Sequence, residues 1–185
     1  MIKTEYRFAA SLKSLMAEVP LDSISVTLLA KKCGVKRQTF YYHFHDIYDL
    51  LTLVYLNEKM QGIEETSSIK QMVKCVYNYY TANKAFVEAT LASACKDLFQ
   101  EFVYNNCYKC FIRFINANKE EKTLQPNDKK AVARFYSMAF SNSFVYYLST
   151  HRNKTLDGLM LSVCYEDEDS IKASIDKIIN AKGRK

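Results

Sequence analysis

Several side chains between residues 37 and 44 have the chemistry to bind a nucleic acid. In this stretch, RQTFYYHF, Phe40 and Phe44 lie four residues apart, which places both on one face of a helix. If that face is buried, Arg37, Gln38 and Tyr41 are left with little core to fill. Arginine suits the edge of guanine and glutamine suits adenine, while Thr39 and Tyr41 could bind phosphates or touch a thymine methyl group.

The elements that must position these side chains are two short helices joined by a tight turn. Ser25 can accept a hydrogen bond from an orphan amide and so begin the first helix. Within it, Leu28, Leu29 and Cys33 recur at spacings that place them on one side. Gly34 suits the left-handed backbone that often ends a helix. Two short helices around such a turn are typical of a helix-turn-helix, whose second helix enters the major groove of DNA.

The same residues resemble the TetR family of bacterial transcription regulators. The run TLLAKKCGVKRQTFYYHF contains the family's apolar-Ala pair (Leu29, Ala30), its Gly-Val turn (Gly34, Val35) and its Thr-apolar-Tyr-x-x-aromatic pattern. The last of these consists of Thr39, Phe40, Tyr41 and Phe44. The similarity covers about the first 55 residues.

The resemblance implies that the matching positions contact DNA. The residues predicted to do so are Ser25, Thr27, Lys36, Arg37, Gln38, Thr39, Tyr41, Tyr42 and His43. Lys36 and Gln38 depart from the small residue and the Gly or Pro that family members often carry there. Ile47 stands where many members have a phosphate-binding lysine, so we expect that contact to be missing.

The charge of the chain is concentrated in this part. Residues 1–45 contain 7 Lys and Arg against 3 Asp and Glu, a net +4 of the chain's +6. An excess of this kind fits a polyanionic partner. A slightly basic surface that only aids solubility is the alternative, and charge alone does not separate the two.

Composition and periodicity predict an all-α protein with two domains. The chain has 185 residues, 4 Gly and 2 Pro, and no alternating strand pattern. We expect a three-helix DNA-binding head and a linking helix over residues 1–61, then a helical-bundle regulatory and dimerisation body over 62–185. Helices are expected at about 4–19, 46–61, 69–83, 85–93, 95–117, 129–150 and 171–179, with 118–128 a loop and 151–165 irregular.

The chain has six scattered cysteines, no signal-peptide pattern and no apolar run of membrane length. These features predict a cytoplasmic protein with reduced thiols. Cys107 and Cys110 form a C-x-x-C within a helix. No further ligands at suitable spacing accompany them, so we expect buried, inert thiols and no metal or other cofactor.

Two sets of residues in the body carry further expectations. An aromatic-rich set is either ordinary core or, as the resemblance implies, the lining of a small-molecule effector pocket: Tyr77, Tyr80, Phe86, Phe102, Phe111 and Phe114. A second set combines small, aromatic and aliphatic side chains and is predicted to form a homodimer interface: Phe135, Tyr136, Ala139, Ser143, Tyr146, Tyr147, Ile171, Ile175 and Ile178. A wholly intramolecular core is the alternative.

The function expected from this pattern is transcriptional regulation. The resemblance implies a repressor that binds a palindromic operator as a dimer and is released by a small-molecule effector. The RQTFYYHF segment also resembles a subgroup that includes an activator of dihydroxyacetone kinase operons, so an activator working with a protein coinducer stays open. A protein-interaction module that lost DNA binding is a further alternative. We do not expect an enzyme, because no phosphate-binding loop, nucleophile elbow or HExxH motif is present.

Overall fold

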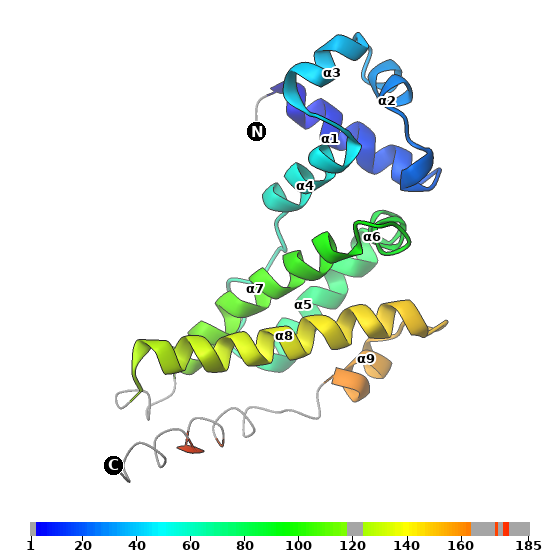
Figure 1. Ribbon diagram of the computed structural model, residues 1–185. Helices are drawn as coiled ribbons and strands as arrows, with labels where there is room; N and C mark the ends of the chain where they lie inside the picture. Colours follow the sequence, from blue (N-terminus) through cyan, green and yellow to red (C-terminus); the bar gives the residue numbers. More distant parts are fainter. Residues whose placement is uncertain (1–2, 118–123, 164–172, 174–175, 178–185) are drawn as a thin grey trace. The chain divides into compact units, whose positions relative to one another are not determined.

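The computed structural model describes residues 3–117, 124–163, 173 and 176–177, and in these residues the regular structure is entirely helical. The prediction of an all-α fold with an N-terminal helix-turn-helix is therefore confirmed. Figure 1 labels the helices, which are α1 (Lys3–Met16), η1 (Leu21–Ser23), α2 (Val26–Lys32), α3 (Arg37–His43), α4 (Ile47–Asn57), α5 (Ile69–Ala82), α6 (Lys84–Leu91), α7 (Lys96–Ala117), α8 (Pro126–Thr150) and α9 (Leu156–Val163).

The chain forms two compact units. The first contains Met1–Lys59 and Tyr80–Phe102, and the second contains Met60–Tyr79 and Val103–Lys185. The division falls inside α5 and α7, so the first unit includes α6 as well as the four N-terminal helices. The division into a head domain, 1–61, and a body domain, 62–185, stays a prediction.

Phe8 of α1 lies at the centre of the helix-turn-helix. Its ring contacts the rings of Phe40 and Phe44 edge to face, with centroids 5.4 and 6.0 Å apart. Leu12 and Leu29 are also fully buried. Burial of these aromatic rings and aliphatic side chains stabilises three helices that are individually too short to persist in water.

Tyr55 of α4 packs among aromatic rings of α6 and α7 in the first unit. Its ring stacks on Phe86 at 5.1 Å and contacts Phe99 and Phe102. Its hydroxyl donates a 2.9 Å hydrogen bond to the buried hydroxyl of Thr90. Burial raises the pKa of Tyr55, because the phenolate would lose its hydration.

Lys13 joins α1 to the same cluster. Its Nζ donates to Glu58 Oε1 at 2.8 Å and to Asn83 Oδ1 at 3.2 Å, and lies 4.9 Å from the centroid of the Phe86 ring. A partly buried ammonium group with these three partners fixes the angle between α1 and α6 more closely than apolar contact alone.

The segment between α4 and α5 is packed into the second unit. Met60, Ile63 and Thr66 are buried, although the predicted boundary between the two domains, at residues 61 and 62, falls in this segment. Arg113 of α7 donates from Nη2 to the Ile63 carbonyl oxygen at 2.6 Å and to Thr66 Oγ1 at 3.1 Å. Charge-assisted hydrogen bonds of this kind hold the segment against α7.

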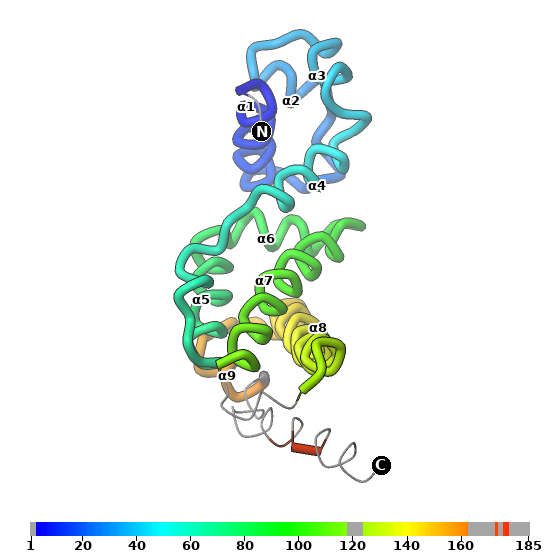
Figure 2. Tube along the Cα trace, turned by 90° about the vertical axis from the view of Figure 1, so that its left-hand side faces the viewer, coloured from blue at the N-terminus to red at the C-terminus, as the bar shows by residue number. Residues whose placement is uncertain are grey.

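In the second unit, the C-terminal part of α7 lies beside α8 (Figures 1 and 2), and the centroids of the Phe111 and Tyr136 rings are 5.8 Å apart. Helix α8 begins at Pro126, three residues before the predicted start, because proline is well suited to a first helical position.

The prediction that residues 151–165 are irregular is wrong, because α9 occupies Leu156–Val163. Its start is held by Tyr147, whose hydroxyl donates to the Thr155 carbonyl at 3.0 Å and accepts from the Thr155 amide at 3.1 Å.

The expected final helix at 171–179 lies largely outside the described residues. Within the part of the chain that is described, no helix is long and apolar enough to span a bilayer.

Candidate nucleic-acid interface

The turn between α2 and α3 has the hydrogen bonds that its sequence predicts. Ser25 Oγ accepts from the Leu28 amide at 3.1 Å at the start of α2. Gly34 has φ +63°, and its amide donates to the Lys31 carbonyl while that of Val35 donates to Ala30, both at 3.0 Å. This paired arrangement closes the end of α2 and turns the chain into α3.

Arg7 of α1 supports the turn from inside. Its guanidinium donates to the Cys33 carbonyl, and the Cys33 thiol donates back to the Arg7 carbonyl at 3.6 Å. Sequence reasoning does not find this residue, because a single arginine on a long helix has no periodic signal and its partner is a backbone atom 26 residues away.

Helix α3 buries its two phenylalanines and exposes its polar side. Phe40 is fully buried and Phe44 nearly so, whereas Tyr41 is 47% and Tyr42 86% exposed. Lys36, Arg37 and Gln38 are exposed as well, and so are Ser25 and Thr27 at the start of α2. The structure thus places seven of the nine predicted contacts at the surface of one helix-turn-helix.

Arg37 and Tyr41 interact on this surface. Arg37 donates to the Tyr41 hydroxyl from Nη2 at 2.8 Å and from Nε at 3.3 Å, and its guanidinium carbon lies 5.2 Å from the Tyr41 ring centroid. The guanidinium has five N–H donors, so several remain for a base or phosphate while Tyr41 limits its rotation.

The other two predicted contacts are less accessible. Thr39 is half-buried, and the His43 side chain is only 11% exposed. His43 Nδ1 lies 3.8 Å from Glu5 Oε1 of α1, and its ring contacts those of Phe8 and Phe44. The structure therefore places His43 between α3 and α1.

The chain leaves α3 through a capped junction. Asp46 Oδ1 accepts from the Asp49 amide at 2.8 Å, and Asp49 Oδ2 accepts from the His45 amide at 3.1 Å, so the two carboxylates cap the start of α4. Ile47, which follows, is buried, so this position has no cation to offer a phosphate.

The predicted effector residues are divided between the two units. Tyr80, Phe86 and Phe102 lie in the first unit and Tyr77, Phe111 and Phe114 in the second. Both tyrosine hydroxyls have partners, since Tyr80 donates to Glu88 Oε1 at 2.8 Å and Tyr77 donates to the Lys154 carbonyl at 2.7 Å. The effector pocket stays a prediction.

The predicted dimer residues on α8 have mixed accessibility. Phe135 is 63% and Tyr146 69% exposed, Ser143 is exposed and Ala139 is half-buried. Tyr136 and Tyr147 are buried by the chain itself. Ile171, Ile175 and Ile178 lie outside the described residues.

The C-x-x-C cysteines are both fully buried. The pKa of the Cys107 thiol is raised well above its usual value. Burial is the larger cause, and the neighbouring Cys110 raises it further. Among the described residues, no group of three or more His, Cys, Asp and Glu side chains has the arrangement of a metal site.

Comparison with known proteins adds two family matches. Residues 10–54 match the family described as bacterial regulatory proteins, tetR family, and residues 67–160 match one described as transcriptional regulator C-terminal region. The solved structure of the dihydroxyacetone kinase operon activator DhaS is similar in fold. It has a TM-score of 0.57 over 98% of this chain and 97% of that chain, at 18% identity. No curated protein matches the chain.

Proposed function

Since this chain belongs to the TetR family of bacterial transcription regulators, we propose that it binds a palindromic DNA operator as a homodimer through the exposed side of α3. The observation that carries the proposal is that α3 is amphipathic. Its apolar side buries Phe40 and Phe44. Its polar side is exposed and contains Arg37, Gln38, Tyr41 and Tyr42. Arg37 and Gln38 would contact base edges, and Tyr41, Tyr42 and Lys36 would contact phosphates. Ser25 and Thr27 would add contacts from the start of α2.

A homodimer is proposed because one helix-turn-helix offers few contacts and a two-fold axis doubles them. On α8, the exposed side chains of Phe135, Met138 and Tyr146 recur at helical spacing and form an apolar stripe. A second copy of the same stripe would bury these side chains. The Ile171, Ile175 and Ile178 segment is proposed to add to the same interface.

Repression relieved by a small molecule is the regulatory role proposed. An effector that binds only one of two body conformations would change the spacing of the paired heads, and one spacing alone matches the groove repeat. An activator that needs a coinducer is the second candidate, favoured by the fold similarity to a protein named as an operon activator.

The decisive experiment measures binding of the full-length protein to the DNA flanking its own gene, by fluorescence anisotropy over a range of salt concentrations. We expect binding that weakens steeply with salt, because each phosphate contact releases a counterion. The double variant R37A/Y41A should lose this binding. R152A, which also removes one exposed arginine but lies outside the helix-turn-helix, should retain it.

Light scattering on the same samples separates loss of DNA contact from loss of assembly. R37A/Y41A should remain dimeric, whereas F135E should become monomeric and bind DNA more weakly. Absence of binding by the unmodified protein at low salt would reject the DNA-binding proposal and favour an interaction module. A promoter-reporter assay with and without the gene then decides between repression and activation.

A further inference from the structure

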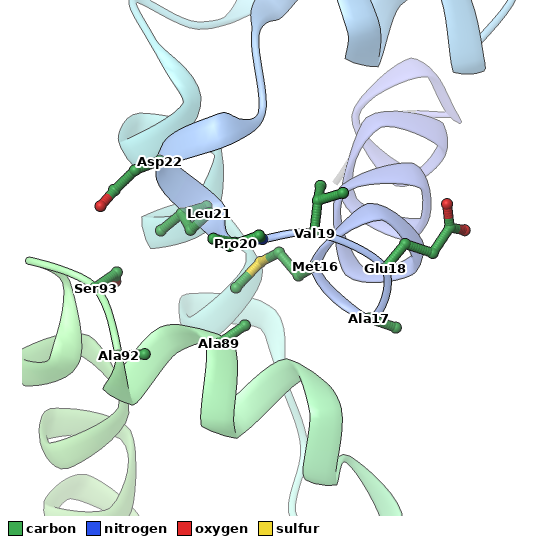
Figure 3. A pocket seen from close by; sticks show the side chains of 10 residues that line it. All are labelled: Met16, Ala17, Glu18, Val19, Pro20, Leu21, Asp22, Ala89, Ala92 and Ser93. Atoms are coloured by element: carbon green, nitrogen blue, oxygen red, sulfur yellow. The ribbon is translucent and has the colours of Figure 1, made fainter.

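A pocket of about 290 Å³ opens in the first unit, where the end of α1 and the loop through η1 face the last turn of α6 (Figure 3). Its volume lies near the lower end of the range of roughly 300–1,000 Å³ that is usual for ligand pockets, so it can hold a small organic molecule. It lies apart from the exposed side of α3 and contains none of the six aromatic residues predicted to bind an effector.

The floor of the pocket is apolar. Met16 and Leu21 are 3% and 2% exposed, and Figure 3 shows the Met16 side chain beside Pro20 and Leu21 and facing Ala89 of α6. Ala89 and Ala92 form the α6 wall, and their short side chains leave the space open. Methionine adapts its shape to a ligand more readily than branched side chains do.

The charged residues of the lining are both acidic. Glu18 and Asp22 contribute carboxylates, and none of the ten lining residues is Lys, Arg or His. Glu18 is already paired with Lys32 at 2.9 Å. Asp22 accepts a hydrogen bond from the neutral Tyr48 hydroxyl at 3.1 Å, and among the described residues it has no ion-pair partner.

The charge of Asp22 also acts on two neighbouring groups. Its hydrogen bond and its charge are the main causes of a raised pKa at Tyr48. At Cys95, which follows the pocket residue Ser93 by two positions, burial raises the thiol pKa first and the charges of Asp22, Asp46 and Asp97 raise it further. The negative charge of Asp22 would repel an anionic ligand and attract a cationic one.

We propose that this pocket binds a small amphipathic cation, with its apolar group on Met16, Leu21, Ala89 and Ala92 and its ammonium group beside Asp22. The pocket combines an apolar floor with an acidic side chain at its edge, which suits a ligand that has one apolar and one cationic end. Because the walls come from α1, η1 and α6, the occupant would stabilise the arrangement of these elements in which the pocket is open. The site does not depend on the DNA-binding proposal.

The test titrates the full-length protein with 2-phenylethylammonium and, separately, with neutral 2-phenylethanol of nearly the same shape. Binding is measured by calorimetry and mapped by NMR of protein labelled in the methyl groups of methionine and alanine. We expect the cation to bind about fivefold more tightly than the alcohol, the difference that one solvent-exposed ion pair typically contributes. The methyl signals of Met16, Ala89 and Ala92 should shift.

Two variants with matched controls test the assignment. D22N should reduce the affinity of the cation to that of the alcohol, whereas Y48F, which keeps the Asp22 charge but removes its hydrogen bond, should preserve the cation's advantage. A92M should fill the pocket and weaken both probes, whereas A94M, an equal addition outside the lining, should not. Equal affinity of both probes, or saturable binding without shifts at Met16 and Ala89, would overturn the proposal even if DNA binding is normal.

Discussion

The Arg37 guanidinium and the Tyr41 hydroxyl are joined by a 2.8 Å hydrogen bond across one turn of α3. The ring of Tyr41 also lies beneath the guanidinium, with 5.2 Å between the Arg37 Cζ atom and the ring centroid. A free arginine loses considerable rotamer entropy when it binds a base, and Tyr41 removes part of that loss before DNA arrives. In the proposed interface, Tyr41 therefore positions Arg37 in addition to any contact of its own.

Tyr41→Phe should weaken operator binding about fivefold, because the hydrogen bond to Arg37 is lost while the ring beneath the guanidinium remains. Anisotropy titrations with operator and with random DNA measure the change. Tyr6→Phe removes a hydroxyl from another exposed tyrosine, 61% exposed on α1, and is the matched control. If Y41F and Y6F bind operator equally, Tyr41 does not position Arg37.

Thr90→Val should destabilise the fold more than Tyr55→Phe. In T90V the buried Tyr55 hydroxyl loses its acceptor, at a cost of about 1–3 kcal/mol, whereas in Y55F the Thr90 hydroxyl keeps its 2.9 Å bond to the Phe86 carbonyl. The loss in Y55F should be nearer 1 kcal/mol. Urea denaturation followed by circular dichroism gives both free energies of unfolding, and the reverse order would contradict this account of the pair.

Gly158→Ala should destabilise α9 by steric conflict rather than backbone strain. An added Cβ would lie 2.5 Å from the Tyr147 hydroxyl oxygen, a distance that requires that side chain to move. We expect a cost of about 1–3 kcal/mol. A double-mutant cycle with Tyr147→Phe checks the cause, because the glycine substitution should cost less once the hydroxyl is absent. If the two substitutions lower the free energy of unfolding additively, conflict with the Tyr147 hydroxyl is not the cause of the loss.

Cys107 should be alkylated far more slowly than Cys75 or Cys95. Burial raises the pKa of all three thiols, so less reactive thiolate exists at neutral pH and alkylation should accelerate as the pH rises. Cys107 is also fully buried, whereas Cys75 and Cys95 are half-buried. Mass spectrometry after timed iodoacetamide treatment measures each rate, and treatment in urea should make the rates similar. Equal native rates would contradict the buried assignment.

The helix-turn-helix was predictable because its determinants are local. Ser25 accepts an amide of its own helix, Gly34 adopts the positive φ that its position requires, and Phe40 and Phe44 lie four residues apart. The position of His43 was available from the same spacing. It follows Phe40 by three residues and therefore lies beside the buried face, where it meets Glu5.

Helix α9 was not predictable from local signals. Gly158 lies within it, and glycine costs about 1 kcal/mol in a helix interior, which argues for a loop. The structure shows why glycine is tolerated there, since Tyr147 of α8 occupies the space that a side chain would need. The buried segment after α4 was missed for a similar reason, because Arg113 lies about 50 residues from its carbonyl partner.

Tyr80–Phe102 belongs to the same compact unit as the first 59 residues, and this affects the design of chimaeric regulators. A graft that transfers only the N-terminal helices would separate Tyr55 from Phe86 and Thr90, and Lys13 from Asn83. The recipient would then need side chains of matching shape and polarity at all three positions. Exchange of both segments together preserves those contacts, so a functional swap requires three junctions in the gene instead of one.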